Sequence, residues 1–353
     1  MVQPNLFINH LVPHPIGKLP IETLEMILIE CARDDYSPSN VFTPTERDAF
    51  PDWLYITYVC RLWRGISLGC PHLWTRITTN LTHRWVTEFL ERSRNYPLVL
   101  EISTVHSHFS EIKAVISANA FRIKELYVGD IRARNRDLRR ELDGRLTAHM
   151  PLLENFILDT DLYEIQDDLF SGHAPRLRRL WLGDAMTSSI TSSLLGNLRE
   201  LVLGESYDTD YLLKLLQHTP LLETLKVKDL VPDLRYSGDV VRLPHLSRLC
   251  IQLNEYRHFV DFLAPLQMPP TVHFRLTLCV SRESSSEEEY GAALDVMADR
   301  IRGISKSLGP LYANVYIEPE KNWCIGWYPM LQTLGDPTVD RIPRRALLDH
   351  GGG

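Results

Sequence analysis

The chain has 353 residues, of which 44% are hydrophobic, and this is enough apolar material for one large or two modest domains with cores. The formal net charge of −7 argues against a nucleic-acid or anionic-membrane partner, because either would need a concentrated excess of Lys and Arg. The first residues lack a basic flank and a continuous apolar run, and no segment approaches a membrane span in length. The sequence therefore predicts a chain without a signal peptide, located in the cytoplasm or the nucleus.

The six cysteines are scattered, most of them lie within apolar runs, and no two form a CxxC pair. This usage is typical of reduced core residues in an intracellular protein. Cys60 lies beside the basic Arg61, but it also follows Val59 on an apolar helix pattern. We therefore expect Cys60 to be a buried structural thiol.

Two apolar helical segments and an aromatic turn are predicted between Leu19 and Ile77. The first begins at Pro20, whose fixed φ suits the first turn of a helix, and the second begins at Pro51 and ends at Gly69. Apolar residues recur every three or four positions in both segments: Leu24, Ile27, Leu28 and Cys31, then Tyr55, Tyr58, Val59, Leu62, Trp63 and Ile66. Apolar side chains on more than one face require a further surface to cover them.

The residues Leu19-Pro20, Ile27-Leu28, Val59–Trp63 and Pro71–Trp74 resemble an F-box, over residues 19–80. The resemblance implies a small helical module that docks on a Skp-type adaptor and joins a cullin-RING ubiquitin ligase. Carried over by position, it implies an adaptor-binding surface of Leu19, Pro20, Leu24, Ile27, Leu28, Val59, Trp63 and Trp74. The family joins its helices with a short acidic-leucine link, whereas residues 34–49 here are rich in Ser, Pro and Thr. The alternative is an ordinary helical hairpin with a tryptophan core.

Beyond this segment, the pattern apolar-x-x-apolar-x-apolar recurs along the chain. Its copies begin at Ile123, Leu153, Leu177, Leu198, Leu222 and Leu246, and from Leu153 onward they are spaced by 24, 21, 24 and 24 residues. These spacings lie in the range of leucine-rich repeats. Weaker copies predict further strands at Pro97–Ser103, Thr271–Val280 and Tyr312–Ile317, and helical patterns at 134–150 and 209–219 lie between strands.

Each repeat is thus predicted to be a strand followed by a helix, and such units stack into a curved parallel sheet with helices outside. The Asn or Cys that ideal leucine-rich repeats place after the third leucine is absent. The predicted fold is α/β, with an N-terminal tail at 1–18, the F-box-like module at 19–80, a leucine-rich-repeat-like domain at 81–320, and a C-terminal segment with a flexible tail at 321–353. An ordinary α/β domain is the alternative to a solenoid.

In a strand of this pattern, the second and third apolar residues point into the core, so the residues that flank them point to the open concave face. Basic and aromatic residues recur at the flanking positions: Tyr127, Arg179, Trp181, Lys226, Lys228, Arg248 and Arg275. Arginine beside tryptophan is typical of binding hot spots, so this face is predicted to hold an acidic or phosphorylated peptide of a protein substrate. A register shifted by one residue would instead place Trp181 in the core.

No sequence motif predicts catalysis, a bound cofactor or a metal: GxxxxGK, GxGxxG, GxSxG and HExxH are all missing. His106 and His108 could ligate a metal, but no Cys or acidic residue stands at ligand spacing, and a polar loop is the alternative. A late helix is predicted from Ser286 to Leu308, with a capping box at its start, and Ser284–Ser286 before three glutamates could be phosphorylated.

The sequence therefore predicts a non-catalytic substrate adaptor of a cullin-RING (SCF-type) E3 ubiquitin ligase. Its partners would be a Skp-type adaptor within the ligase core and an unidentified protein substrate, with no cofactor, nucleic acid or membrane. The alternative is a repeat scaffold outside any ligase, whose helical hairpin caps the solenoid.

Overall fold

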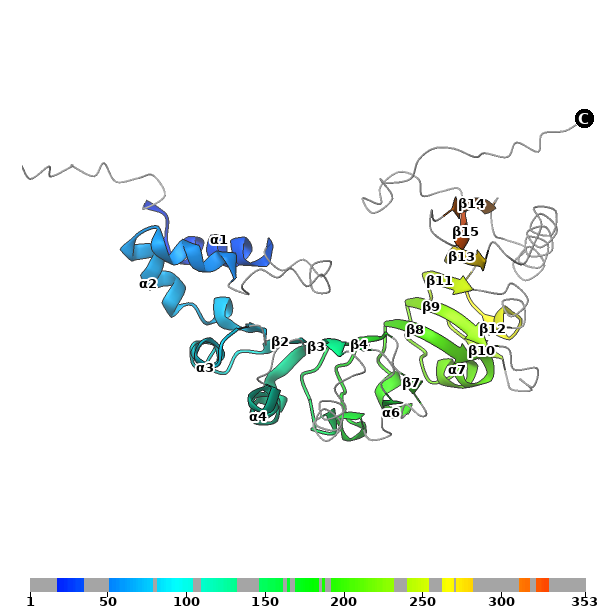
Figure 1. Cartoon of the computed structure of the whole chain (residues 1–353), viewed down its shortest axis with the longest axis horizontal. Coiled ribbons are helices and arrows are strands. Elements are labelled where there is room, and N and C mark those ends of the chain that lie inside the picture. Colours follow the sequence, from blue (N-terminus) through cyan, green and yellow to red (C-terminus); the bar gives the residue numbers. More distant parts are fainter. Residues whose placement is uncertain are drawn as a thin grey trace, which may run out of the picture. The chain divides into compact units, whose positions relative to one another are not determined.

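The computed structural model describes residues 18–34, 51–78, 81–103, 109–131, 146–160, 164–165, 169–183, 186–187, 192–231, 240–253, 262–269, 271–281, 311–317 and 322–329. The chain divides into two compact units, Met1–Ile112 and Lys113–Gly353, and the division falls within α4 (Phe109–Asn119). Figure 1 shows the elements of each unit in chain order.

The first unit begins with α1 (Ile21–Asp34), which starts directly after Pro20 as the fixed φ of proline predicts. Leu24, Leu28 and Ala32 recur every four residues and are buried. Ile27 and Cys31, which the sequence pattern places on the same stripe, are exposed. The buried stripe of α1 is therefore narrower than predicted, and part of its apolar surface faces outward.

The predicted second helix is in fact two helices. The 3-10 helix η3 (Asp52–Tyr58) is followed by α2 (Arg61–Gly69), and Cys60 between them is extended, with φ −160° and ψ 169°. The Cys60 Sγ accepts a hydrogen bond from the backbone N–H of Trp63 at 3.5 Å, so it caps α2. Cys60 is exposed, which contradicts the prediction of a buried thiol. Because the helix is broken, the predicted apolar stripe is broken too, and its exposed members are Tyr55, Tyr58, Val59 and Leu62.

An aromatic cluster forms the core of the first unit. It joins Trp53 of η3, Trp74 of η4 (Pro71–Trp74) and Phe89 of α3 (His83–Arg92), all of them buried. The ring centroids of Trp53 and Trp74 are 5.2 Å apart and those of Trp74 and Phe89 4.9 Å, both in edge-to-face contact. Trp74 Nε1 donates to the carbonyl of Ser67 at 2.9 Å, so the buried indole N–H has an acceptor. The strands β1 (Arg76–Thr78) and β2 (Leu98–Ser103) pair in parallel in the same unit.

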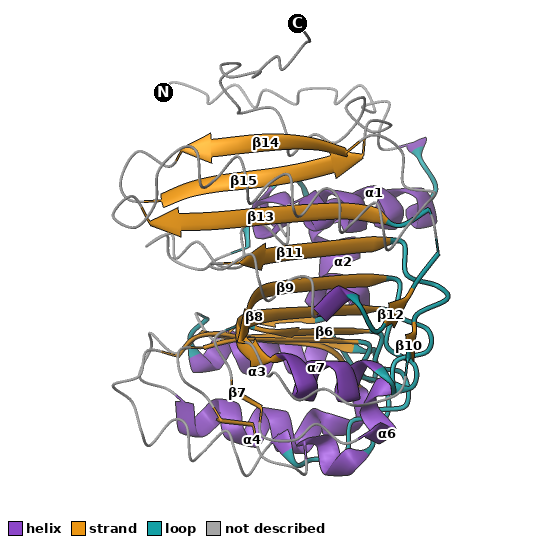
Figure 2. Ribbon diagram, turned by 90° about the vertical axis from the view of Figure 1, so that its right-hand side faces the viewer, coloured by secondary structure: helices purple, strands orange, loops and turns teal. Residues whose placement is uncertain are grey.

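The second unit is built on a mostly parallel sheet (Figure 2). In sheet order its strands are β3 (Ile123–Ile131), β4 (Asn155–Thr160), β6 (Arg179–Leu182), β8 (Glu200–Asp208), β9 (Thr224–Val231), β11 (Arg248–Leu253), β13 (His273–Ser281), β15 (Asn322–Pro329) and β14 (Leu311–Ile317). Each neighbouring pair from β3 to β13 is parallel, whereas β15 is antiparallel to both β13 and β14. The prediction of an α/β fold with a parallel sheet is confirmed, and the antiparallel β15 was not predicted.

The strands keep the register that the leucine pattern predicts. In β6, Leu180 and Leu182 are buried while Arg179 is exposed, and in β9 Leu225 and Val227 are buried while Lys226 is exposed. The buried leucines of adjacent strands lie opposite one another, as Leu180 and Leu201 do. The period of two along each strand thus separates a core face from an open face.

The core face of the second unit is covered by short elements. They are η5 (Ala120–Arg122), η6 (Leu169–Gly172), α6 (Ser192–Leu195), α7 (Thr209–Leu216) and two small parallel pairs, β5 (Glu164–Ile165) with β7 (Met186–Thr187) and β10 (Val241–Arg242) with β12 (Leu266–Gln267). In Figure 1, α6 and α7 lie on the same face of the sheet, and no described helix of this unit lies on the open face.

The prediction of one helix in each repeat is therefore too regular. Among the described connections from β4 to β13, only α7 runs beyond a single turn. Asp208 explains why α7 forms: its side chain accepts hydrogen bonds from the backbone N–H groups of Asp210 at 2.8 Å and Tyr211 at 3.2 Å. The other described connections are short turns, 3-10 helices, a single helical turn or two-residue strands.

Several sequence predictions lie outside the described residues. These are the metal-ligand candidates His106 and His108, the helix from Ser286 to Leu308 with its phosphorylation site, and residues 134–145 of a predicted helix. In the part of the chain that is described, no helix is both long and apolar enough to cross a membrane.

Candidate binding surfaces

The first unit exposes an unusual number of large apolar side chains. Among the described residues, every exposed large hydrophobic except Tyr96, Phe121 and Val240 lies between residues 19 and 62. We call this group the helical apolar surface: Leu19, Ile21, Met26, Ile27, Tyr55, Tyr58, Val59 and Leu62. It comes from Leu19 and the first two turns of α1, from η3 and Val59 after it, and from α2, and these three helices pack on one another. Clustered exposed apolar residues of this kind mark interaction surfaces.

The residues that the F-box resemblance assigns to adaptor binding separate into two groups. Leu24, Leu28 and Trp74 are buried in the core of the first unit, so their side chains support the surface from beneath. The others lie at the surface, exposed in four cases and half-buried in the case of Trp63: Leu19, Pro20, Ile27, Val59 and Trp63. Those five keep the accessibility that an adaptor contact needs.

The open face of the second unit carries the predicted substrate residues in aligned rows. One row pairs Tyr127, Ile157, Trp181, Val202, Lys226, Cys250 and Arg275 across successive strands. The neighbouring row contains Arg179, Glu200, Thr224 and Arg248. In the first row the residues from β3 to β8 are apolar or aromatic and the basic residues are on β9 and β13, whereas the second row has arginines on β6 and β11 with Glu200 and Thr224 between them.

Glu200 lies between two of the predicted basic residues. Its carboxylate accepts a hydrogen bond from Arg179 Nε at 2.7 Å and lies 3.4 Å from Lys226 Nζ. The side chains are exposed or half-exposed, so each pair is worth roughly 0.2 to 1 kcal/mol. The open face is therefore less basic than its Lys and Arg content suggests, because the Glu200 carboxylate forms ion pairs with both Arg179 and Lys226.

The remaining predicted substrate residues differ in accessibility. Lys228 and Arg248 are exposed and Trp181 is half-buried, so all three can be reached from the open face. Tyr127 is only 7% exposed, and its hydroxyl donates to Glu125 Oε2 at 2.5 Å. The side chain of Arg275 lies outside the described part of the chain. Tyr127 is thus better placed to support the surface than to contact a ligand.

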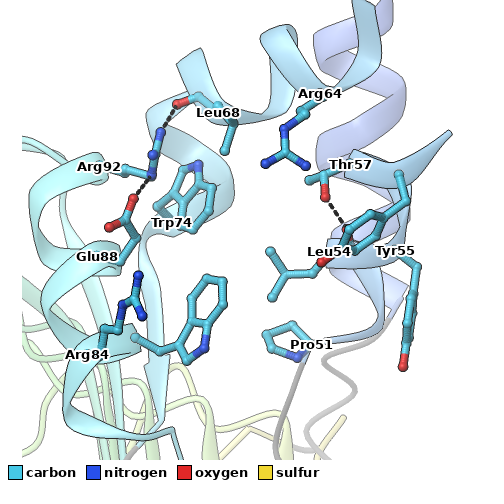
Figure 3. A pocket seen from close by; sticks show the side chains of 12 residues that line it. Pro51, Leu54, Tyr55, Thr57, Arg64, Leu68, Trp74, Arg84, Glu88 and Arg92 are labelled. Atoms are coloured by element: carbon cyan, nitrogen blue, oxygen red, sulfur yellow. Dashed lines mark hydrogen bonds and ion pairs between the residues drawn. The ribbon is translucent and has the colours of Figure 1, made fainter. Parts of the chain in front are cut away.

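A cleft that the sequence analysis missed opens in the first unit (Figure 3). It has a volume of about 420 Å³ and lies between η3 and α2 on one wall and α3 on the other. Its charged residues are Arg64, Arg84, Glu88 and Arg92. The sequence signal was the spacing of four between Arg84, Glu88 and Arg92, which places three charges on one face of α3.

Neither unit presents a candidate metal centre among the residues described, and the buried thiol of Cys70 is not activated. No group of three or more His, Cys, Asp or Glu residues is close enough there to hold a metal ion. Burial raises the pKa of the Cys70 thiol, despite opposing hydrogen bonds from backbone groups at His72 and Leu73, so this thiol is protonated at neutral pH.

The chain was also compared with known proteins. No family model matches it, and no curated protein matches it.

Proposed function

We propose that this protein is a non-catalytic substrate adaptor of a cullin-RING ubiquitin ligase, in which the first unit docks on a Skp-type adaptor and the second unit holds a protein substrate. The observation that carries the proposal is the helical apolar surface. Leaving this many large apolar side chains in water is unfavourable, at roughly 25 cal/mol per Å² of apolar area, so a partner that covers them gains the corresponding free energy.

The F-box assignment adds a specific occupant to that surface. The motif positions that remain accessible, Leu19, Pro20, Ile27, Val59 and Trp63, come from the same elements as the rest of the surface. The buried motif positions Leu24, Leu28 and Trp74 would hold the module rigid. A preformed apolar surface of this kind loses little conformational entropy on docking.

We further propose that the second unit is a degenerate leucine-rich-repeat solenoid. The parallel strands, the aligned buried leucines and the repeat spacings of 24, 21, 24 and 24 residues support this assignment. In such an array the open face is a broad surface for a protein ligand. Trp181, Lys228 and Arg248 are the accessible candidates there, together with Arg179 and Lys226, which share Glu200.

The proposed mechanism is proximity. An adaptor that holds a substrate beside a charged ubiquitin-conjugating enzyme raises the local concentration of the substrate's lysines, and no residue of the adaptor needs to take part in the chemistry. The function would take place in the cytoplasm or the nucleus, where the ligase core is found.

Reconstitution tests the proposal. The purified full chain is mixed with a Skp-type adaptor, then with a cullin-RING core, and the mixtures are separated by size-exclusion chromatography. We expect the chain to elute with the adaptor and to join the cullin only when the adaptor is present. Elution of a folded chain apart from the adaptor at micromolar concentrations would refute the ligase proposal.

A further inference from the structure

The cleft in the first unit is held open by a fixed set of contacts around Arg92. Its Nη1 donates to the carbonyl of Leu68 at 3.0 Å and so joins α3 to the end of α2. Its Nε forms an ion pair with Glu88, one turn earlier on α3. Its guanidinium also lies 5.0 Å from the ring centre of Trp74, which the core holds in place. The two walls are therefore connected before any ligand arrives, so the cleft is preformed.

Two other arginines of the cleft have no such partners. Arg64 and Arg84 are exposed, and among the described residues neither guanidinium forms an ion pair or a hydrogen bond. Figure 3 shows Arg64 directed from α2 toward the space between the walls, with Arg84 on the α3 wall. Because Glu88 balances Arg92, the charges of Arg64 and Arg84 remain without a counter-ion at the cleft. This contrasts with a chain whose net charge is −7.

Apart from Thr57, whose hydroxyl donates to the carbonyl of Leu54, the rest of the lining is apolar or aromatic. Pro51, Leu54 and Trp85 line the cleft, and Tyr55 and Tyr58 extend this lining outward. The two tyrosines are 69% and 75% exposed, so aromatic surface continues beyond the enclosed volume. A ligand that uses both the cleft and this rim is longer than a single small anion. It also needs apolar side chains next to its negative charges.

We propose that this cleft binds a short acidic peptide segment of a partner protein, with Arg64 and Arg84 pairing its carboxylates and the tryptophan and tyrosine rings covering its apolar side chains. Charge complementarity selects an acidic partner, because two guanidiniums face the site without a counter-ion. The exposed rings of Tyr55 and Tyr58 favour an extended peptide segment, because they lie beyond the enclosed volume of the cleft. Tyr55 and Tyr58 belong both to the cleft rim and to the helical apolar surface, whereas the charged residues Arg64 and Arg84 and the accessible motif positions assigned to the Skp-type adaptor do not overlap. Loss of peptide binding in the arginine variants with unchanged adaptor binding therefore distinguishes this inference from the proposed function.

The test uses the full chain and a fluorescein-labelled peptide of alternating glutamate and leucine, with binding followed by fluorescence polarisation. The control peptide replaces each glutamate with glutamine. We expect saturable binding of the glutamate peptide, weakening as salt increases, and at least about tenfold weaker binding of the glutamine peptide, because charge-assisted hydrogen bonds are lost. Arg64→Glu/Arg84→Glu should abolish binding of the glutamate peptide.

Matched variants make the result specific to the cleft. Arg61→Glu changes the charge of an exposed arginine on the same helix that does not line the cleft, and it should leave binding within about twofold of wild type. Arg64→Lys/Arg84→Lys keeps the charge but loses the planar fork, so it should bind with intermediate affinity. Circular dichroism of each variant checks that the unit remains folded.

Four outcomes would overturn the inference. They are the absence of saturable binding by wild type, equal binding of the glutamine peptide, equal loss in Arg61→Glu, and binding of inorganic phosphate alone as tight as that of the peptide. The last would make the cleft a small-anion site.

Discussion

The two units use their apolar residues in opposite ways. The second unit buries the leucines of its repeats almost completely and presents charged side chains such as Arg179 and Lys226 on its open face. The first unit buries an aromatic cluster but leaves Val59, Tyr55 and other large apolar residues exposed. A fully satisfied core needs no partner for stability, whereas an exposed apolar face gains from one. In the proposed function, this difference favours the first unit as the part that binds the Skp-type adaptor and the second unit as the part that binds a substrate.

Their charges differ as well. On the open face and the neighbouring strand ends of the second unit, Glu200 serves Arg179 and Lys226, and Arg199 pairs with Glu223. In the cleft of the first unit, Arg64 and Arg84 have no such carboxylate among the described residues. Cations that are already paired contribute less to ligand binding, because a ligand must replace an existing interaction. The first unit is thus the stronger candidate for anion recognition.

The largest expected effect is on the stability of the first unit, where a core tryptophan and a surface tryptophan can be compared. Trp74→Ala removes a fully buried ring and its hydrogen bond to Ser67, so it should lower the stability of this unit by about 3 to 5 kcal/mol. Trp63→Ala, at a half-buried position, should leave the unit folded but weaken binding of a Skp-type adaptor by about 2 kcal/mol. Urea denaturation and isothermal titration measure the two quantities. Equal destabilisation by both variants would contradict the assignment of Trp63 to the surface.

The next effect tests the packing of the second sheet. A Cβ on Gly204 would lie 2.8 Å from the backbone carbon and oxygen of Gly183 on the neighbouring strand segment, a distance that backbone atoms cannot relieve cheaply. Gly204→Ala should therefore cost about 1 to 3 kcal/mol of stability. Gly196→Ala has open space around the new methyl group and should change stability by about 0.5 kcal/mol or less, or increase it slightly. Thermal unfolding compares them, and similar melting temperatures would show that the close approach is absent.

A smaller effect is expected on the open face. Lys226→Glu/Lys228→Glu should weaken capture of a substrate about tenfold, roughly 1.4 kcal/mol, and more at low salt than at high salt. Adaptor binding should not change. Lys214→Glu/Arg242→Glu makes the same charge change on α7 and β10 and serves as the control. Quantitative mass spectrometry of captured proteins gives the result, and identical captured sets from both double variants would place the substrate elsewhere.

The smallest perturbation is the alkylation of single cysteines in the first unit. Cys31 and Cys60 are exposed and should react with iodoacetamide at neutral pH, whereas Cys70 should remain unmodified until the chain unfolds. Burial raises the Cys70 pKa above its value in the unfolded chain. The contribution of the neutral thiol to the free energy of unfolding is therefore complete below the unfolded pKa and is lost as the pH rises through the folded pKa. Peptide mapping after timed labelling measures how fast each cysteine is modified. Labelling of Cys70 as fast as of Cys31 would show that the core of the first unit opens.

The strands of the second unit could be predicted because one physical rule determines them. Alternation with a period of two, together with repeated spacing, is sufficient to assign which residues of β6 or β9 face the core. The connections could not be predicted as well, because their form depends on single caps such as Asp208. The antiparallel β15 was missed because its pairing with β13 and β14 is long-range and no repeat signals it.

The first unit was predicted in outline only. Helical periodicity ran continuously from Tyr55 to Ile66, but Cys60 adopts an extended backbone and redirects the chain. The break leaves residues of the expected buried stripe exposed, and this is the origin of much of the helical apolar surface. The cleft could not be derived from periodicity, because it needs the relative placement of α2 and α3 that the Trp74 cluster determines.

The most direct test of the central claim compares two valines. Val59 in the helical apolar surface is 62% exposed and Val240 in the second unit is 59% exposed, so aspartate at either position should leave the fold intact. We predict that, in titrations of the full chain with a Skp-type adaptor, Val59→Asp weakens binding at least about tenfold and Val240→Asp binds as wild type does. Equal affinities for wild type and a folded Val59→Asp protein would contradict docking through the first unit.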